Sequence, residues 1–253
     1  MTTPDPIAFT IFGLSVRWYG ILIAAAIISG GIVMFIRAKD HGISADDVTD
    51  ILLAAVPCGI VGARAYYVAF NWDYYRGSAL RIMDFRAGGL AIHGGLILGL
   101  FGAYLMCRHK KIRFADALDS AAPGIALAQA IGRWGNFFNG EAHGGPTDLP
   151  WGIIVDGVRV HPTFLYESIW CLMLFFFLMW LDRHRAFEWQ TFLSYAFLYS
   201  LERFFVEHLR TDSLMIGPFK QAQVLSAAVM LACAVTYVIL YRKNKKQKSA
   251  SAH

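Results

Sequence analysis

The chain has 253 residues, of which 57% are hydrophobic and only 16% are charged, and its mean hydropathy is +0.46. Soluble globular domains usually contain about 45–50% apolar and about 25% charged residues. The composition therefore excludes an ordinary soluble protein and indicates an integral membrane protein. The formal net charge is +5, and no nucleic-acid partner is expected.

Apolar segments follow one another along the whole chain. The first, "YGILIAAAIISGGIVMFI" (19–36), has no charged residue. At about 1.5 Å per residue it is long enough to cross a hydrocarbon core of about 30 Å. Seven such segments are expected, at residues 17–36, 48–70, 88–107, 115–132, 163–181, 190–206 and 220–241. The sequence predicts an all-α, polytopic membrane protein with seven transmembrane helices in one domain, residues 1–253.

The basic residues predict how these helices are oriented. Thirteen of the 23 lysines and arginines follow the first, third, fifth and seventh segments: Arg37, Lys39, Arg108, Lys110, Lys111, Arg113, Arg183, Arg185, Arg242, Lys243, Lys245, Lys246 and Lys248. Short loops rich in lysine and arginine stay in the cytoplasm. The N-terminus is therefore expected outside and the C-terminus inside. The basic tail, residues 242–253, is expected to mark this topology and to contact anionic lipid.

The cysteines give no sign of a metal site. Cys58, Cys107, Cys171 and Cys233 lie in or at the ends of apolar segments, and no C-x-x-C pair occurs. Such cysteines are usually small packing residues. The sequence therefore predicts no disulfide, no metal site and no cofactor.

The remaining ten basic residues lie outside the loops and the tail that are expected in the cytoplasm. Nine of them are arginines, whose planar guanidinium can bind a phosphate through two hydrogen bonds. Arg76, Arg81 and Arg86 fit an ordinary polar loop with side chains that reach the membrane interface. Arg64 lies deeper, within the second segment, where an ionisable group is costly and usually faces a cavity. Arg64 is therefore a candidate binding residue.

Other polar side chains are predicted on the same outer side. Together with Arg64 they come from six of the seven segments: Tyr19, His93, Arg133, His161, Glu167, Tyr199, Arg203 and Glu207. The last three are four residues apart, so they share one face of a helix. Packing alone does not require so many polar groups at one side of the membrane. The pattern predicts a functional site there.

The stretch "GRWGNFFNGEAHGG" (132–145) stands out within this set. It contains five glycines, which accept positive φ and close backbone approach. Irregular backbone at membrane depth persists only within protein or beside a polar cavity. We expect Arg133 to close the fourth helix and the following residues to form a ligand-cradling loop. The alternative is a structural hinge in which Arg133 pairs with Glu141.

The same stretch resembles the signature segment of the bacterial prolipoprotein diacylglyceryl transferases. The matching residues are Gly132, Arg133, Gly135, Asn136, Phe137, Asn139, Glu141 and Gly144. "RWYG" (17–20), "GARAYYV" (62–68), "GGLAIHGG" (88–95), "HPTFLYE" (161–167) and "RFFVEHLRTD" (203–212) also resemble family segments in the family's order. The resemblance runs from about residue 15 to residue 241. One residue departs from the pattern: Phe164 stands where the family usually has glutamine.

The resemblance implies a transferase of the bacterial inner membrane with its active site on the outer, periplasmic side. The diacylglyceryl group of phosphatidylglycerol would pass to the lipobox cysteine of a prolipoprotein, forming a thioether and releasing glycerol phosphate. His93, Arg133 and Arg203 are the implied catalytic residues. The implied substrate-binding residues are Arg133, Tyr19, Asn136, Asn139, Glu141, Gly144, Arg64 and Tyr199. The implied partners are phosphatidylglycerol, a prolipoprotein signal peptide with its lipobox cysteine, and the lipid bilayer itself.

The origin of the substrate thiolate stays open. A thiol has a pKa of about 8.5 and is mostly protonated at neutral pH. His93 is the natural base, because imidazole accepts a proton near neutrality. An arginine field alone is the alternative, with His93 as a positioning or structural residue, and Glu141 is a further candidate base.

Two other classes of membrane protein fit the sequence less well. Buried arginines in seven helices also suit a lipid or anion transporter, but transport needs access from both sides and usually an internal repeat, and none is visible. A membrane protease lacks support, since neither G-x-S-x-G nor H-E-x-x-H occurs. Asp116 and Asp119 are expected to be interfacial helix-end acids.

Overall fold

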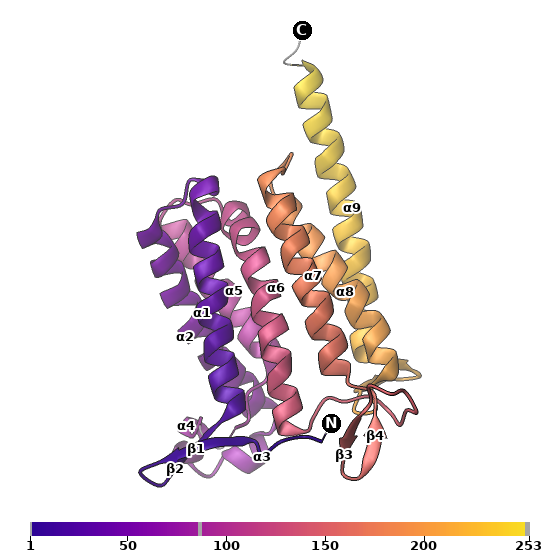
Figure 1. Cartoon of the computed structure of the whole chain (residues 1–253). Coiled ribbons are helices and arrows are strands. Elements are labelled where there is room, and N and C mark those ends of the chain that lie inside the picture. Colours follow the sequence, from indigo (N-terminus) through magenta and orange to yellow (C-terminus); the bar gives the residue numbers. More distant parts are fainter. Residues whose placement is uncertain (1, 86–87, 251–253) are drawn as a thin grey trace. The chain divides into compact units, whose positions relative to one another are not determined.

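The computed structural model describes residues 2–85 and 88–250. Arg86 and the last three residues of the basic tail lie outside this range. The helices are α1 (Trp18–Ala38), the 3-10 helix η1 (Lys39–His41), α2 (Ala45–Phe70), α3 (Trp72–Tyr75), α4 (Ala79–Met83), α5 (Ile92–His109), α6 (Phe114–Asn139), α7 (Thr163–Arg183), α8 (Gln190–Leu209) and α9 (Gln221–Ala250) (Figure 1). The strands are β1 (Ile7–Ile11), β2 (Leu14–Arg17), β3 (Ile153–Val155), β4 (Val158–Val160), β5 (Met215–Ile216) and β6 (Phe219–Lys220).

Each of the seven segments expected from the sequence overlaps one long helix: α1, α2, α5, α6, α7, α8 or α9. Within the described residues, four helical stretches are long and apolar enough to cross a membrane. These are Trp18–His41, Ala45–Phe70, Thr163–Arg183 and Gln221–Ala250. The prediction of an all-α membrane protein is therefore confirmed at this level.

The chain divides into two compact units. Unit 1 comprises Met1–Arg37 and Leu118–His253, and unit 2 comprises Ala38–Ala117. Unit 1 thus contains α1, nearly all of α6, and α7 to α9, whereas unit 2 contains α2 to α5. The single domain expected from the sequence stays a prediction, and each unit is described below by itself.

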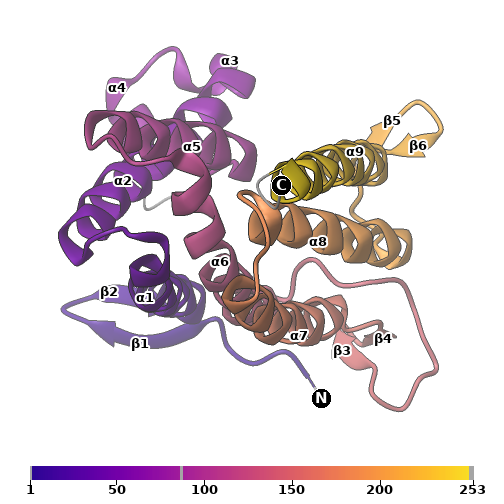
Figure 2. The same cartoon turned by 90° about the horizontal axis from the view of Figure 1, so that it is seen from above.

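In unit 1, α8 packs against both α7 and α9, and the two views show these three helices side by side (Figures 1 and 2). Small residues of α6 face larger ones of α7 and α8 in the buried core, which contains Ala122, Ala126, Leu174, Leu178, Leu181 and Tyr195. Elsewhere Gly30 of α1 crosses Gly124 of α6 so closely that a side chain at either position would meet the other backbone. Small residues at such a crossing are typical of membrane helix pairs.

Polar contacts tie together the helix ends opposite the site described below. Arg37, at the end of α1, pairs with buried Asp182 of α7 at 2.6 Å, and Asp182 accepts a hydrogen bond from Thr191 of α8. Asp119 of α6 accepts hydrogen bonds from the backbone nitrogens of Trp189 and Phe192, each at 2.8 Å. Asp119 therefore caps the N-terminus of α8, whose free N–H groups require acceptors. Asp119 is thus more than an interfacial acid.

Three short antiparallel hairpins complete unit 1: β1–β2, β3–β4 and β5–β6. The β1–β2 turn consists of Phe12 and Gly13, both with positive φ, which matches the twist of a two-residue hairpin loop. No pattern in the sequence predicted these strands. The β3–β4 hairpin helps to bury a second core of Phe137, Ile153, Val155, Val160 and Phe164.

In unit 2, α2 and α5 run antiparallel and pack through glycines. Gly62 faces Gly94. About two helix turns further along α5, Gly102 faces Ala54 and Cys58. Side chains at Gly62 or Gly94 would clash with the opposite helix. The N-terminus of α2 is capped by Ser44, whose hydroxyl accepts a hydrogen bond from the Asp47 backbone nitrogen at 3.1 Å.

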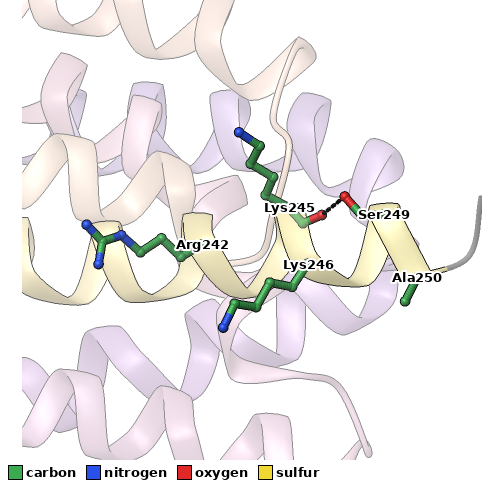
Figure 3. Close-up of a pocket in the computed structure, with 5 residues that line it drawn as sticks. All are labelled: Arg242, Lys245, Lys246, Ser249 and Ala250. Atoms are coloured by element: carbon green, nitrogen blue, oxygen red, sulfur yellow. Dashed lines mark hydrogen bonds between the residues drawn. The ribbon is translucent and has the colours of Figure 1, made fainter.

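Helix α9 extends well past the ends of α7 and α8 and carries the basic tail on its last turns (Figure 1). Arg242, Lys245 and Lys246 line a shallow surface pocket with Ser249 and Ala250, and their charged ends point away from the helix (Figure 3). The Ser249 hydroxyl donates to the Lys245 carbonyl at 3.1 Å. The described part of the tail is therefore helical and exposed.

Candidate active site

The signature stretch is mostly helical, which corrects the sequence prediction. α6 continues to Asn139, so Arg133 lies six residues before its end and does not close it. Of the five glycines in 132–145, only Gly140 has positive φ, +65°. Gly140 directly follows the last helical residue, where a left-handed glycine commonly ends a helix. The irregular segment begins there.

Gly135 has a packing role in the helix. A side chain at this position would come within 2.7 Å of the Tyr19 ring of α1. The missing side chain lets Tyr19 lie directly against α6, within electrostatic range of both Arg133 and Glu141. The structure thus brings Tyr19, from the start of the chain, to the signature segment.

Arg133 is held on two sides. Its Nε forms an ion pair with the carboxylate of Glu167 on α7, and its Nη2 donates to the Tyr199 hydroxyl of α8 at 3.0 Å. The third guanidinium nitrogen, Nη1, bonds to none of the residues that the structure describes. The side chain is 20% exposed. Arg133 is therefore fixed in place with one pair of N–H donors left for a ligand.

Glu167 also binds Arg203, so one carboxylate joins two arginines. The Arg203 Nη1 donates to Glu167 Oε1 at 3.0 Å, and its Nη2 pairs with Glu207 one helix turn further along α8. Arg210 approaches the same Oε1 at 3.9 Å. Glu167 is only 1% exposed, and a buried carboxylate is retained when cations surround it.

Arg210 is itself paired with Asp212, by hydrogen bonds of 2.9 and 2.7 Å. Partial burial of Asp212 opposes its ionisation, but the hydrogen bonds from Arg210 outweigh this effect. The pKa of Asp212 therefore lies below its ordinary value. Asp212 stays ionised, and the outer edge of the arginine cluster stays paired, into the acidic range.

The two asparagines of the signature segment form hydrogen bonds with its acidic residue, Glu141. The side-chain amides of Asn136 and Asn139 donate to Glu141 Oε1 at 3.2 and 3.1 Å. The alternative in which Arg133 pairs with Glu141 is wrong, because Arg133 pairs with Glu167 instead. Glu141 is exposed, so these three residues present hydrogen-bonding groups at the end of α6.

Gly144 attaches the segment after α6 to the two neighbouring helices. Its nitrogen donates to the His161 carbonyl at 2.9 Å, and the Gly145 nitrogen donates to the Leu209 carbonyl at 3.0 Å. A side chain at Gly144 would lie 2.7 Å from His161 Cβ and 3.1 Å from the Leu209 carbonyl oxygen. Glycine at position 144 is therefore needed for close packing and not for a positive φ.

Two predicted site residues belong to unit 2. His93 is the second residue of α5, is exposed, and forms no hydrogen bond with the residues that the structure describes. Its ring lies 6.2 Å from that of Tyr66. A structural bond to a backbone carbonyl, the alternative role, therefore finds no acceptor within the described part of the chain.

Arg64 is buried as expected, but protein carbonyls occupy its donors. Its guanidinium donates to the carbonyls of Arg81, Ile82, Gly88 and Gly89 at 2.5 to 3.1 Å, and its charge lies 5.0 Å from the centre of the Tyr75 ring. Arg64 thus clamps the loop between α2 and α5. Its predicted role in substrate binding stays a prediction.

Glu167 is the main site residue that the sequence analysis did not select. It appeared there only as a polar group at the start of a helix, because the sequence does not tell which acid an arginine will contact. Phe164, the departure from the family pattern, is 5% exposed and stacks on Phe137 at 4.8 Å. This position therefore contributes to the core and makes no polar contact.

The fold and the site define a helical membrane protein whose polar centre is a group of arginines ordered by buried carboxylates. Comparison with known proteins shows which family within this class the chain belongs to. Residues 6–239 match the family "Prolipoprotein diacylglyceryl transferase", and the chain belongs to that family.

Three similar proteins bear the name phosphatidylglycerol–prolipoprotein diacylglyceryl transferase. The one from Clostridioides difficile is 51% identical over 245 residues, covering 97% of this chain and 99% of the relative. The one from Finegoldia magna is 50% identical over 244 residues, with coverages of 96% and 97%. The one from Clostridium novyi is 46% identical over 255 residues, with coverages of 97% and 98%.

Replacing Glu167 by glutamine should destabilise unit 1. The amide keeps the shape of the side chain but leaves Arg133 and Arg203 without their common anion. Breaking a buried ion pair by removing one partner typically costs about 3–5 kcal/mol, and the partial exposure of both arginines favours the lower end. Thermal unfolding of the purified variant should show a clearly lowered Tm. The same change at exposed Glu188 serves as control, and equal Tm values for both variants would contradict the central role of Glu167.

Proposed function

We propose that this chain transfers the diacylglyceryl group of phosphatidylglycerol to the lipobox cysteine thiol of a prolipoprotein. One observation carries the proposal: within the segment that carries the family signature, Arg133 is fixed by Glu167 and Tyr199, and its Nη1 bonds to no residue in the described part of the chain. The names of the relatives from C. difficile and F. magna support the two substrates.

The main catalytic requirement of this reaction is the stabilisation of negative charge on the departing phosphate. The thiolate sulfur attacks the glyceryl carbon, the bond from that carbon to the phosphate oxygen breaks, and glycerol phosphate leaves with the bond's electron pair. Negative charge on the phosphate grows as this happens. Preorganised donors stabilise such charge most strongly where water is scarce. Arg133 would supply a donor pair to the phosphate, and Arg203 would add its positive charge.

The other signature residues suit the glycerol head group. Asn136, Asn139 and Glu141 form a hydrogen-bonded group at the end of α6, and Tyr19 lies against the same helix. Hydroxyl groups of a glycerol can both donate to and accept from such residues. We assign these residues to binding and orienting the head group, with Gly144 shaping the adjoining backbone. His93 remains the proposed base.

Purified protein incubated with phosphatidylglycerol and a lipobox peptide tests the proposal. Thioether-linked diacylglyceryl peptide and glycerol phosphate should form in equal amounts. No second compartment should be needed, in contrast to a transporter, which family membership does not support. Lipid consumption without peptide modification would overturn the proposal.

The membrane arrangement is part of the proposal. We infer seven transmembrane helices in the bacterial inner membrane, with the N-terminus and the arginine site on the periplasmic side. Unit 1 supports this order, because the start of α7 meets the ends of α6 and α8 at the site. The basic tail of α9 would then contact anionic lipid of the cytoplasmic leaflet.

This topology makes a direct prediction. In intact spheroplasts, a tag at the N-terminus should be cleaved by added protease, whereas a tag at the C-terminus should be protected until the membrane is permeabilised. The thirteen basic residues assigned to the cytoplasmic side give the physical reason. Protection of the N-terminal tag together with cleavage of the C-terminal tag would move the site away from exported prolipoproteins and contradict the function.

A further inference from the structure

A second buried acid lies at the arginine site without any bond. Glu202 precedes Arg203 on α8 and lies three residues after Tyr199, on a neighbouring part of the same face. It is 5% exposed. Neither of its carboxyl oxygens accepts a hydrogen bond from the residues that the structure describes. A buried polar group without a partner is costly and rare, so its presence calls for a function.

The charged and titratable groups that act on Glu202 come from three helices. They are Arg133 on α6, Glu167 and Cys171 on α7, and Arg203 on α8 itself. Arg133 contacts Glu167 and Tyr199, and Arg203 contacts Glu167 and Glu207. Among the described residues, neither arginine bonds to Glu202. Glu202 is therefore close enough to influence the arginines through charge but takes no part in holding them.

The net charge of the site depends on whether Glu202 is protonated. Arg133 and Arg203 carry two positive charges, and Glu167 and Glu207 carry two negative charges when ionised. The pair Arg210–Asp212 adds nothing to the sum. The site is then neutral if Glu202 holds a proton and carries one net negative charge if Glu202 is ionised. A phosphodiester anion would be repelled in the second state and accepted in the first.

We propose that Glu202 is a positioning residue that couples binding of the anionic lipid head group to uptake of one proton. With the proton on Glu202, the arginine pair is free to hold the phosphodiester. When Glu202 ionises, its charge attracts the same guanidinium groups and opposes the lipid. The proton comes from solvent, and no covalent step is involved. The inference rests on the proposed function, because it assumes that phosphatidylglycerol is the anion bound.

The pH dependence of KM tests this coupling. For the wild-type protein, KM for phosphatidylglycerol should rise with pH, by up to about tenfold per pH unit once Glu202 ionises. Glu202→Gln is neutral at every pH and has nearly the same shape. Its KM should stay low and flat, with kcat within about twofold of wild type at acidic pH. Glu188→Gln, the same change at an exposed site, should keep the wild-type profile.

Calorimetry gives a second readout that needs no turnover. Titration with short-chain phosphatidylglycerol in two buffers of different ionisation enthalpy should reveal uptake of up to one proton by wild type and none by Glu202→Gln. Absence of proton uptake in wild type, or equal uptake in the variant, would overturn the inference. Failure of the proposed function looks different: no thioether product would form at any pH.

Discussion

Replacing Arg133 by lysine should lower the rate of diacylglyceryl transfer by about 10²–10³-fold, equivalent to about 3–4 kcal/mol of transition-state stabilisation. Lysine keeps the positive charge. It cannot, however, contact Glu167 and Tyr199 while also presenting a pair of planar donors to a phosphate. Arg133→Ala should be at least as severe. The assay is initial rate of thioether formation with purified protein.

The control for this experiment is Arg76→Lys. Arg76 is an exposed arginine that directly follows the short helix α3 and pairs with Asp73 of that helix. The Arg76→Lys variant should transfer at the wild-type rate. Thermal unfolding should show that Arg133→Lys is folded, since Arg203 still neutralises Glu167. Near-normal turnover by Arg133→Lys would refute the role of the guanidinium geometry.

The sequence indicates which residues share a helix face better than it indicates which residues pair between helices. The spacing of Tyr199, Arg203 and Glu207 placed them on one helix face, and the ion pair between Arg203 and Glu207 confirms this. The pairing of Arg133 with Glu167 depends on how α6 and α7 are rotated against each other. No local pattern in the sequence contains that information.

The loop prediction was wrong for residues 132–139, which are helical, for a related reason. Glycine costs about 1 kcal/mol relative to alanine inside a helix, so Gly132 and Gly135 suggested irregular backbone. In the structure Gly135 instead makes room for the Tyr19 ring, a contact between residues more than a hundred positions apart. Tertiary packing outweighed the local preference.

Arg64 is a further case in which the sequence does not identify the partners of a charged residue. Its depth in an apolar segment correctly predicted burial, with 3% exposure. Its acceptors are backbone carbonyls of the following loop, which carry no signature in the sequence. Depth alone therefore indicates that a buried arginine has partners but does not identify them.

The largest open question of mechanism concerns the proton of the substrate thiol, and His93→Gln addresses it. If His93 is the base, this variant should transfer about 10²–10⁴-fold more slowly. The wild-type kcat should rise with pH until the base is fully deprotonated, and the variant should lack this rise. His109→Gln, at the other end of the same helix α5, is the matched control and should behave as wild type.

A change of nucleophile then separates proton removal from positioning. A selenocysteine lipobox peptide is already ionised at neutral pH and needs no base. It should restore most of the rate lost in His93→Gln, while it should leave Arg133→Lys impaired, because that variant lacks phosphate stabilisation and not a base. His93 is free of hydrogen bonds to the described residues and exposed at the start of α5, as an accessible base requires. If the selenol peptide fails to rescue His93→Gln, the residue positions a substrate, and thiolate formation falls to the field of Arg133 and Arg203.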